Sequence, residues 1–352
     1  MPVEIAYKIC KNDTNLVSLY LFQFIAMKEI IGMDKMNKIK NDITILYSNL
    51  KETFEEIIKD KKWLDEETKN RIIKKLNSIE FFIPIPEKLD ILEVDWEYKF
   101  LKIHPDHKYP VIKEILEYFF TLFDYNEYIL ARALYIQPNA GYNYLFNFIM
   151  ASLGLLLEPV YGTKFMASLK FGGYGSILAH EILHGYSGRS LKYTEKFNFN
   201  DLLTDYSLKN YIKKAECIVN QYDNKTYKDS DFKASGLNTH TENISDNSGI
   251  KLAFIAYKKY VEKYGYEKNK MRTFGKYTND QLFYISWAQY MCEIYKPSKV
   301  EYLFFEDSHL PGEMRIENTL KNQEGFAKAF NCKEGSKMNP KDKCEVWRYR
   351  KN

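Results

Sequence analysis

The segment FGGYGSILAHEILHGYS, from Phe171 to Ser187, contains the motif from which the rest of the sequence can be interpreted. Within it, His180, Glu181 and His184 form an HExxH motif. Side chains at positions i and i+4 of a helix project from one face, so both imidazoles can reach one metal ion. A glutamate at the second position lies beside the metal and takes a proton from a water that zinc has acidified. A helix with two incidental histidines is the alternative.

A third ligand is predicted from residues 238–249, which read NTHTENISDNSG and open a long amphipathic helix expected to end at Gly265. Glu242 and Asp246 are again at i and i+4 and share a face. Glu242 can complete a His, His, Glu zinc shell, with the fourth position left to water. Asp246 can hydrogen-bond the far nitrogen of a ligand histidine. Alone, such an acidic pair would only compensate the helix dipole.

Length and composition favour a globular protein. The chain has 352 residues, of which 45% are hydrophobic and 28% charged, enough for a sizeable core in about two domains or one large one. This composition excludes a disordered or fibrous protein. The formal net charge of +4 is too small for a general nucleic-acid or anionic-membrane binder. We therefore expect no nucleic-acid partner.

No targeting or membrane-spanning segment is expected in this chain. The first residues, MPVEIAYKICKNDTN, lack the basic flank and apolar stretch of a secretory signal. The most apolar run, Leu145 to Leu157, is interrupted by polar residues and is shorter than the roughly 20 residues that a spanning helix needs. We interpret this run as buried core or strand.

Glycine placement predicts a helical first third, because only Gly32 of the 16 glycines precedes residue 141. Residues 16–59 carry apolar side chains at helical spacing, and Asp65 can cap a second helix that runs to about Ile79. A short helix is expected from Val111 to Phe123, before a mixed region that begins near residue 136.

Further motifs follow one another along the chain in a fixed order and spacing. They are WLDEET at 63–68, NAGY at 139–142, ECIVNQY at 216–222, GLNTHTENISDNSG at 236–249, DQLFYISWAQYMC at 280–292, DSHLPGEMRIENTLKN at 307–322 and CKEGSKMNPKDKCEVW at 332–347. With the HExxH segment, this series resembles the carboxy-terminal part of the neprilysin and endothelin-converting-enzyme family of zinc endopeptidases. The resemblance implies a predominantly helical α+β fold. It also implies a thermolysin-like zincin catalytic domain at residues 101–352 and the remnant of a helical lid domain at residues 1–100.

The resemblance implies a metal centre with one Zn²⁺ per chain. His180, His184 and Glu242 would be the zinc ligands, and Glu181 would be the general base. Asp246 would be the hydrogen-bond partner of a ligand histidine, His180.

Two residues of the DSHLPGEMR segment would act on the substrate. His309 would stabilise the tetrahedral intermediate, and Arg315 would hold a substrate carbonyl. Charge develops on the former carbonyl oxygen during attack, so a donor placed beside the metal stabilises the transition state more than the ground state. Without the resemblance, His309 would be interpreted as a surface loop histidine.

Peptide substrates would bind by strand addition. Asn139 and Ala140 match the edge-strand pair that hydrogen-bonds the substrate backbone; without the family, the asparagine would be interpreted as turn chemistry. Ile177, Tyr290 and Met291 fall where the family builds its apolar pocket for the residue after the cleaved bond.

Several departures from the family pattern affect the supports of this site. After its second zinc histidine the family commonly has two aspartates, one of which orients that histidine, whereas this chain has Ser187 and Gly188. A lost partner of this kind typically lowers metal affinity or activity by about 10 to 100-fold. Residues 152–154 read SLG in place of proline-alanine-glycine, and Ser176 and Met291 replace larger or aromatic residues. We expect a working or weakened protease rather than an inactive one.

Five cysteines are an odd number, so either they are reduced thiols or at least one partner lies elsewhere. By the family's pattern, Cys217 and Cys344 would pair within the chain. Cys10, Cys292 and Cys332 would each pair with a cysteine of an absent amino-terminal half, as in an extracellular or cell-surface enzyme.

Potential glycosylation sequons begin at Asn12 and Asn224 and also favour a secreted protein. A third sequon at Asn243 lies beside the metal ligand and is expected to be unused.

The leading hypothesis is therefore a zinc-dependent metalloendopeptidase that hydrolyses internal bonds of small peptides. The second is a truncated or weakened homologue that binds zinc or peptide without catalysis, because family members are longer than this chain. A cytosolic scaffold that binds no metal has little support, since it would leave six polar groups aligned for no reason.

Overall fold

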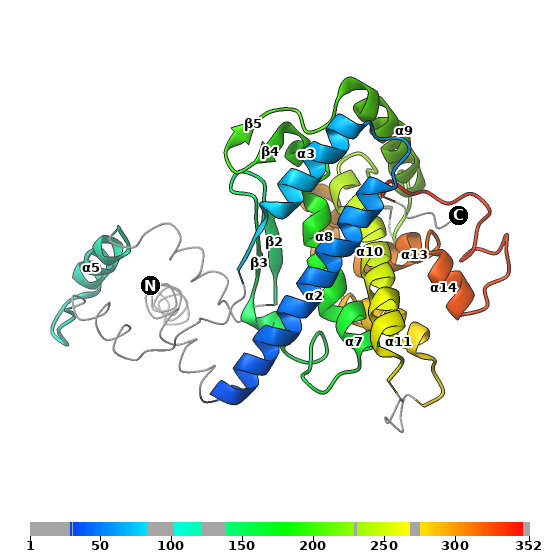
Figure 1. Cartoon of the computed structure of the whole chain (residues 1–352). Helices are drawn as coiled ribbons and strands as arrows, with labels where there is room; N and C mark the ends of the chain where they lie inside the picture. Colours follow the sequence, from blue (N-terminus) through cyan, green and yellow to red (C-terminus); the bar gives the residue numbers. More distant parts are fainter. Residues whose placement is uncertain are drawn as a thin grey trace. The chain divides into compact units, whose positions relative to one another are not determined.

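The computed structural model describes residues 29, 31–82, 102–121, 138–228, 231–267 and 275–347 (Figure 1). It confirms the expected predominantly helical α+β fold. The helices are α2 (Met33–Lys59), α3 (Glu66–Asn77), α5 (Tyr109–Thr121), α7 (Ala167–Lys170), α8 (Ser176–His184), α9 (Asp205–Tyr222), α10 (His240–Tyr264), α11 (Asn279–Tyr290), α12 (Pro297–Phe305), α13 (Gly312–Leu320) and α14 (Glu324–Ala329). The strands are β1 (Glu80–Phe82), β2 (Ala140–Asn143), β3 (Phe148–Ala151), β4 (Tyr193–Glu195) and β5 (Asn198–Phe199).

The chain divides into two compact units. The first comprises Met1–Asn41, Phe82–Asn139 and Met150–Leu155, and the second Asp42–Phe81, Ala140–Ile149 and Leu156–Asn352. The domain boundary expected near residue 100 falls among residues 83–101, outside the described part of the chain, and stays a prediction. The HExxH segment lies in the second unit.

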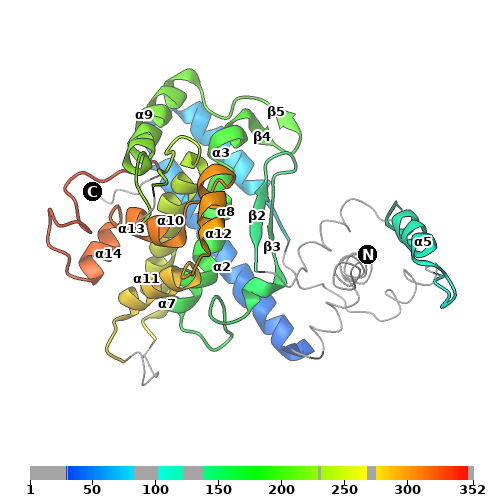
Figure 2. The same cartoon turned by 180° about the vertical axis from the view of Figure 1, so that it is seen from behind.

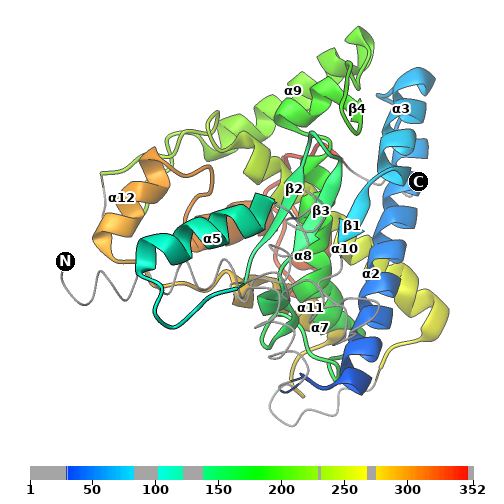
Figure 3. The ribbon, with the colours of Figure 1, turned by 90° about the vertical axis from the view of Figure 1, so that its left-hand side faces the viewer.

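Helices α8 and α10 pack against each other in the interior of the second unit. Figures 1, 2 and 3 show this pair between α2 on one side and α12 on the other. The apolar positions of α2 that follow helical spacing are buried, which confirms the predicted periodicity from residue 33 onward; the part of that prediction at residues 16–28 lies outside the described residues. They are Ile43, Leu46, Leu50, Phe54, Ile57 and Ile58.

The HExxH helix belongs to a longer helical run. Helix α7 leads into a single π turn at Phe171–Gly175, and α8 continues from it without a break. The sequence predicted the helix but not the π turn, a feature found frequently at functional sites. The long helix expected from the second motif is α10, and Gly265 ends it with φ of 82°, a left-handed conformation that favours glycine.

The strands form a three-stranded sheet in the order β1-β3-β2 and a β4-β5 hairpin. The apolar run from Leu145 to Leu157 supplies β3 and a short 3₁₀ helix at Leu153–Leu156, and Ile149 and Ala151 are fully buried. The interpretation of this run as buried core or strand is confirmed. Across the described residues, no helix combines the length and apolar character that a membrane span requires.

The end of the described chain is anchored in the core. The indole of Trp347 lies 5.2 Å from that of Trp63 and 6.0 Å from the ring of Phe54, centroid to centroid. A disulfide joins Cys217 and Cys344, the pair that the family resemblance implies, across 127 residues of sequence. Such a cross-link typically stabilises a protein by about 2–4 kcal/mol.

The other cysteines have no disulfide partner within the described part of the chain. Cys292 is exposed and Cys332 is half-buried, and both are free thiols. Cys10 lies outside the described residues.

Asp65 caps α3 as predicted, but it also serves a second helix. Its Oδ1 accepts a hydrogen bond from the backbone N–H of Thr68 at 2.8 Å. Its Oδ2 accepts hydrogen bonds from the hydroxyls of Ser207, at 2.5 Å, and Thr204, the N-cap of α9. Burial alone would raise the pKa of Asp65, but these hydrogen bonds hold it well below its usual range. One carboxylate thus joins the amino termini of two helices.

We predict that Asp65→Ala lowers the free energy of unfolding by about 2 kcal/mol at pH 7, the upper end for a helix cap. The pKa of Asp65 is lower in the folded protein than in the unfolded chain, where it is about 3.9. The stabilisation by the charged carboxylate is therefore present above a pH of about 3.9 and is lost as the pH falls toward the folded-state pKa. Urea unfolding at pH 7 and pH 3 measures both effects. The control Glu67→Ala removes an exposed carboxylate of the same helix turn and should change stability by less than about 0.5 kcal/mol. If Asp65→Ala and Glu67→Ala lowered the free energy of unfolding equally, the explanation that Asp65 caps both helices would be contradicted.

Candidate metal centre

Helices α8 and α10 bring the three predicted zinc ligands to one point. His180 and His184 lie one turn apart on α8, and their Nε2 atoms are 2.9 Å from each other. Glu242 lies in the first turn of α10. Its Oε2 atom is 3.2 Å from His180 Nε2 and 3.3 Å from His184 Nε2.

A third imidazole enters from the loop between α12 and α13. The Nε2 atom of His309 lies 3.0 Å from Glu242 Oε2. Three donor atoms lie within 4.8 Å of one another, close enough to hold a metal ion. They come from His180, Glu242 and His309, one atom from each residue. The centre therefore gathers three imidazole nitrogens around one carboxylate oxygen.

The residues of this centre fit a metal ion. Glu242 Oε2 is buried and has no hydrogen-bond donor of good geometry, an arrangement that is costly for an isolated carboxylate. Burial alone would raise the pKa of Glu242, but the three surrounding imidazoles hold it well below its usual range. The carboxylate is thus ionised, as a ligand must be. Imidazole nitrogens and a carboxylate oxygen are donors that Zn²⁺ uses in proteins.

Behind this centre, Asp246 contacts one of the imidazoles. It lies one turn after Glu242 on α10, and its Oδ1 is 2.9 Å from His180 Nδ1. Arg315 of α13 holds the same carboxylate with two bonds, from Nε to Oδ2 at 2.7 Å and from Nη2 to Oδ1 at 2.8 Å. Burial would raise the pKa of Asp246, but the charge of Arg315 and the contact with His180 hold it well below its usual range.

Asp307 makes two contacts with His309, and sequence reasoning missed it. Its Oδ1 accepts a hydrogen bond from the backbone N–H of His309 and lies 2.9 Å from His309 Nδ1. Burial would raise the pKa of Asp307, but both contacts with His309 lower it. The signal was present in the sequence, since the carboxylate stands two residues before the histidine in DSHLPGEMR.

Glu181 lies on α8 between the two histidines and is only 6% exposed. Throughout the described ranges, no hydrogen bond or ion pair to its carboxylate is found, and it is not one of the grouped donor atoms. A buried, unpaired carboxylate beside a metal centre is available to accept a proton from water.

Two of the three expected pocket residues, Ile177 and Tyr290, lie at the first turn of α8. Ile177 belongs to that turn, while Tyr290 ends α11 and the buried Met291 caps it. Burial raises the pKa of Tyr290 and the negative charge of Asp246 raises it further, whereas a hydrogen bond with Ser176 lowers it. The phenol therefore lies close to both α8 and the Asp246 carboxylate.

The two strand residues fall in different units. Ala140 is the first residue of β2, which packs against α8 (Figure 3). Asn139 belongs to the first unit, where it exchanges two hydrogen bonds with Ser152. The Ser152 N–H donates to Asn139 O at 2.8 Å, and Ser152 Oγ accepts from Asn139 N–H at 2.9 Å. A proline at position 152 would have neither an N–H nor a hydroxyl, so both of these hydrogen bonds depend on the serine.

Close approach of α8 and α10 depends on Gly249. A Cβ atom at this position would lie 2.8 Å from the backbone nitrogen of His180 and 2.9 Å from its Cα. No side chain fits at those distances, so glycine allows the two backbones to touch beside the first histidine.

We predict that Gly249→Ala pushes the two helices apart. The free energy of unfolding should fall by about 1–3 kcal/mol, the usual cost of overpacking, although alanine is by itself the better helix former. Metal affinity should fall as well, because Glu242 moves relative to the histidines. Urea unfolding and zinc titration measure the two effects. The matched control is Gly141→Ala, whose Cβ meets nothing within 4 Å; effects of the same size in both variants would contradict the explanation.

Comparison with known proteins gives the family context of this geometry. The chain is 33% identical to neprilysin-1 of Caenorhabditis elegans over 323 residues, which cover 88% of this chain and 42% of that protein. It is 32% identical to human neprilysin over 320 residues, again 88% of this chain and 42% of the relative. The chain thus spans less than half the length of these curated relatives.

A likeness of fold extends to solved structures. The crystal structure of the Mycobacterium tuberculosis zinc metalloprotease ZMP1 in complex with an inhibitor superposes with a TM-score of 0.72 at 23% identity. The match covers 92% of this chain and 50% of that chain. The sequence model of peptidase family M13 matches residues 139–346, more than half of the chain and all of the metal centre. The chain belongs to peptidase family M13.

Proposed function

We propose that this chain is a zinc-dependent metalloendopeptidase that hydrolyses internal bonds of small peptides. The observation that carries the proposal is the convergence of three imidazole nitrogens on the buried Oε2 of Glu242. The unpaired carboxylate of Glu181 lies on α8, between two of these histidines.

One Zn²⁺ ion would be held by His180, His184 and Glu242. His184 is favoured over His309 as the third ligand because the helix fixes it one turn from His180, whereas His309 comes from a loop and its side chain is 42% exposed. The exposed imidazole is better placed to meet a substrate.

When bound, zinc acidifies a water molecule and polarises the carbonyl of the bond to be cleaved. Glu181 accepts the proton of the attacking water and delivers it to the leaving amine. With Nδ1–H directed at Asp307, His309 donates from Nε2 to the developing oxyanion in its doubly protonated form. Burial would lower the pKa of His309, but its contacts with Glu242 and Asp307 raise it and so favour that form. Asp246 keeps the proton of His180 on Nδ1 and leaves the Nε2 lone pair for the metal.

Substrate contacts are assigned to residues around this centre. Asn139 and Ala140 would bind the peptide backbone as an added strand. Arg315 uses Nε and Nη2 to hold Asp246 and would offer its remaining N–H groups to a substrate carbonyl. The residue after the cleaved bond would meet the apolar surface formed by Ile177, Tyr290 and Met291.

An extracellular or cell-surface location fits the disulfide and the exposed sequon at Asn224. The sequon at Asn243 is fully buried, which supports its being unused. Cys10, Cys292 and Cys332 would pair with cysteines outside this chain.

Metal removal tests the proposal. The purified chain should contain about one zinc per chain and cleave a quenched oligopeptide, a chelator should abolish cleavage, and added Zn²⁺ should restore it. We expect His184→Gln to lose zinc and His309→Gln to keep zinc but lower kcat by about 10²-fold or more. His104→Gln changes an exposed histidine of the first unit and is the matched control.

The reverse result, with zinc lost from His309→Gln and kept by His184→Gln, would exchange the two roles. Zinc bound without any cleavage would favour the alternative function, a zinc- or peptide-binding homologue without catalysis.

A further inference from the structure

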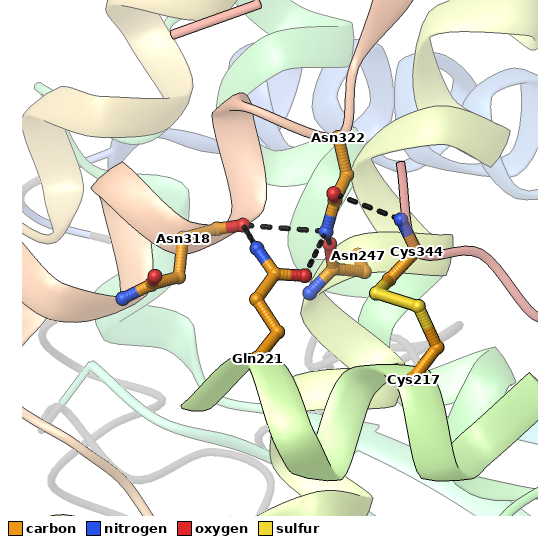
Figure 4. Close-up of a disulfide and its surroundings, with 6 residues drawn as sticks. All are labelled: Cys217, Gln221, Asn247, Asn318, Asn322 and Cys344. Atoms are coloured by element: carbon orange, nitrogen blue, oxygen red, sulfur yellow. Dashed lines mark hydrogen bonds between the residues drawn. A yellow bond between two sulfur atoms is a disulfide. The ribbon is translucent and has the colours of Figure 1, made fainter. Parts of the chain in front are cut away.

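Beside the metal centre, α9, α10 and the segment after α13 share a buried network of amide side chains (Figure 4). Asn322 stands in the middle and is 2% exposed. Its Nδ2 donates to Asn247 Oδ1 at 2.7 Å and to Gln221 Oε1 at 2.8 Å. Its Oδ1 accepts the backbone N–H of Cys344 at 3.1 Å, next to the disulfide.

Asn247 connects this network to α10 and α9. Its Nδ2 donates to the carbonyl of Asn243 at 2.7 Å and to the hydroxyl of Tyr222 at 3.0 Å. Its backbone carbonyl accepts from Gln323 Nε2 at 3.0 Å. Both asparagine side chains therefore use their oxygen and nitrogen atoms, and buried amides bonded in this way hold the elements that carry them rigidly.

On α10, the network residue Asn247 directly follows Asp246, which contacts the metal centre. Asp246 contacts His180 and Arg315, and the next residue, Asn247, contacts Asn322. Arg315 belongs to α13, and Asn322 lies two residues after the last residue of that helix, Leu320. Contacts with α10 from the helix itself, at Arg315, and from just after its end, at Asn322, restrain α13 relative to α10.

We propose that Asn247 and Asn322 are positioning residues for the metal centre. Their amide pair holds α13 in the one register in which Arg315 grips both oxygens of Asp246, and Asp246 in turn faces His180. A pair of apolar side chains could fill the same space, but it would not select this register, because apolar contacts lack direction. The inference rests on the proposed zinc function.

Aspartate substitutions test the proposal in the full chain. Asn322→Asp keeps the shape of the side chain but removes the two N–H donors, and Asn247→Asp does the same at the other member of the pair. We expect each variant to weaken zinc binding about 10-fold, the lower end for groups that support a ligand. The Co²⁺-substituted protein should show a changed visible absorption spectrum, and kcat should fall about 10-fold with a smaller change in KM.

The matched control is Asn210→Asp on α9. The Asn210 amide donates to two carbonyls, those of Trp63 and Tyr206, and lies outside the network. A role in folding alone would lower thermal stability without changing the cobalt spectrum. If an aspartate variant does not fold, Asn322→Ser removes the amide without adding charge and gives the same readouts.

Folded variants with the zinc affinity and cobalt spectrum of the unmodified chain would overturn the positioning role. Failure of the proposed function is distinguishable, because the unmodified chain would then bind no zinc or cleave no peptide.

Discussion

Glu181→Gln is expected to retain zinc and to lose about 10³-fold in kcat for peptide cleavage. Proton transfer by a positioned side chain contributes roughly 10²–10⁴-fold, and an amide cannot accept a proton at neutral pH. Glutamine fills nearly the same space, so the packing of the 6% exposed side chain is kept. Zinc content should not change, since Glu181 is outside the group of donor atoms around Glu242.

Metal analysis and steady-state kinetics on a quenched oligopeptide measure both parts of this result. Glu313→Gln makes the same chemical change at an exposed position of α13, where the carboxylate pairs with Lys228, and should leave kcat within about two-fold of the unmodified chain. Equal turnover in the unmodified chain and Glu181→Gln would remove Glu181 from the mechanism.

Local patterns account for the parts of the fold and site that the sequence predicted. Helical spacing of apolar residues identified α2, Asp65 marked the start of α3, and Gly265 marked the end of α10. Each of these signals involves residues that lie within one or two helical turns of one another in the sequence. The HExxH spacing placed two histidines on one helix face for the same reason. Such features depend on neighbours three or four residues away and so are visible in the sequence.

Features that depend on distant neighbours were not predictable in this way. The second cap made by Asp65 involves Ser207, 142 residues away, and the amide pair joins Asn247 to Asn322, 75 residues away. Gly249 looks like any helical glycine until α8 packs against it. Only the family resemblance brought His309 to the metal centre, since periodicity cannot place a loop residue beside a helix.

The largest effect on stability is expected at the Asp246–Arg315 pair. The Asp246 side chain is 2% exposed and that of Arg315 is 17% exposed, so removing one charge leaves the other buried without its partner. Breaking a buried pair typically costs about 3–5 kcal/mol. Asp246→Asn and Arg315→Gln should each lower the free energy of unfolding of the zinc-free chain by about 3 kcal/mol.

The double variant, Asp246→Asn with Arg315→Gln, separates stability from metal binding. It leaves no unpaired charge, so most of the lost stability should return in urea unfolding. Zinc affinity should remain about 10 to 100-fold below that of the unmodified chain, because His180 Nδ1 still lacks its carboxylate partner. Arg315→Gln alone should weaken zinc less than Asp246→Asn, since Asp246 still faces His180. A double variant that regained both stability and zinc affinity would show that Asp246 acts on the centre only through folding.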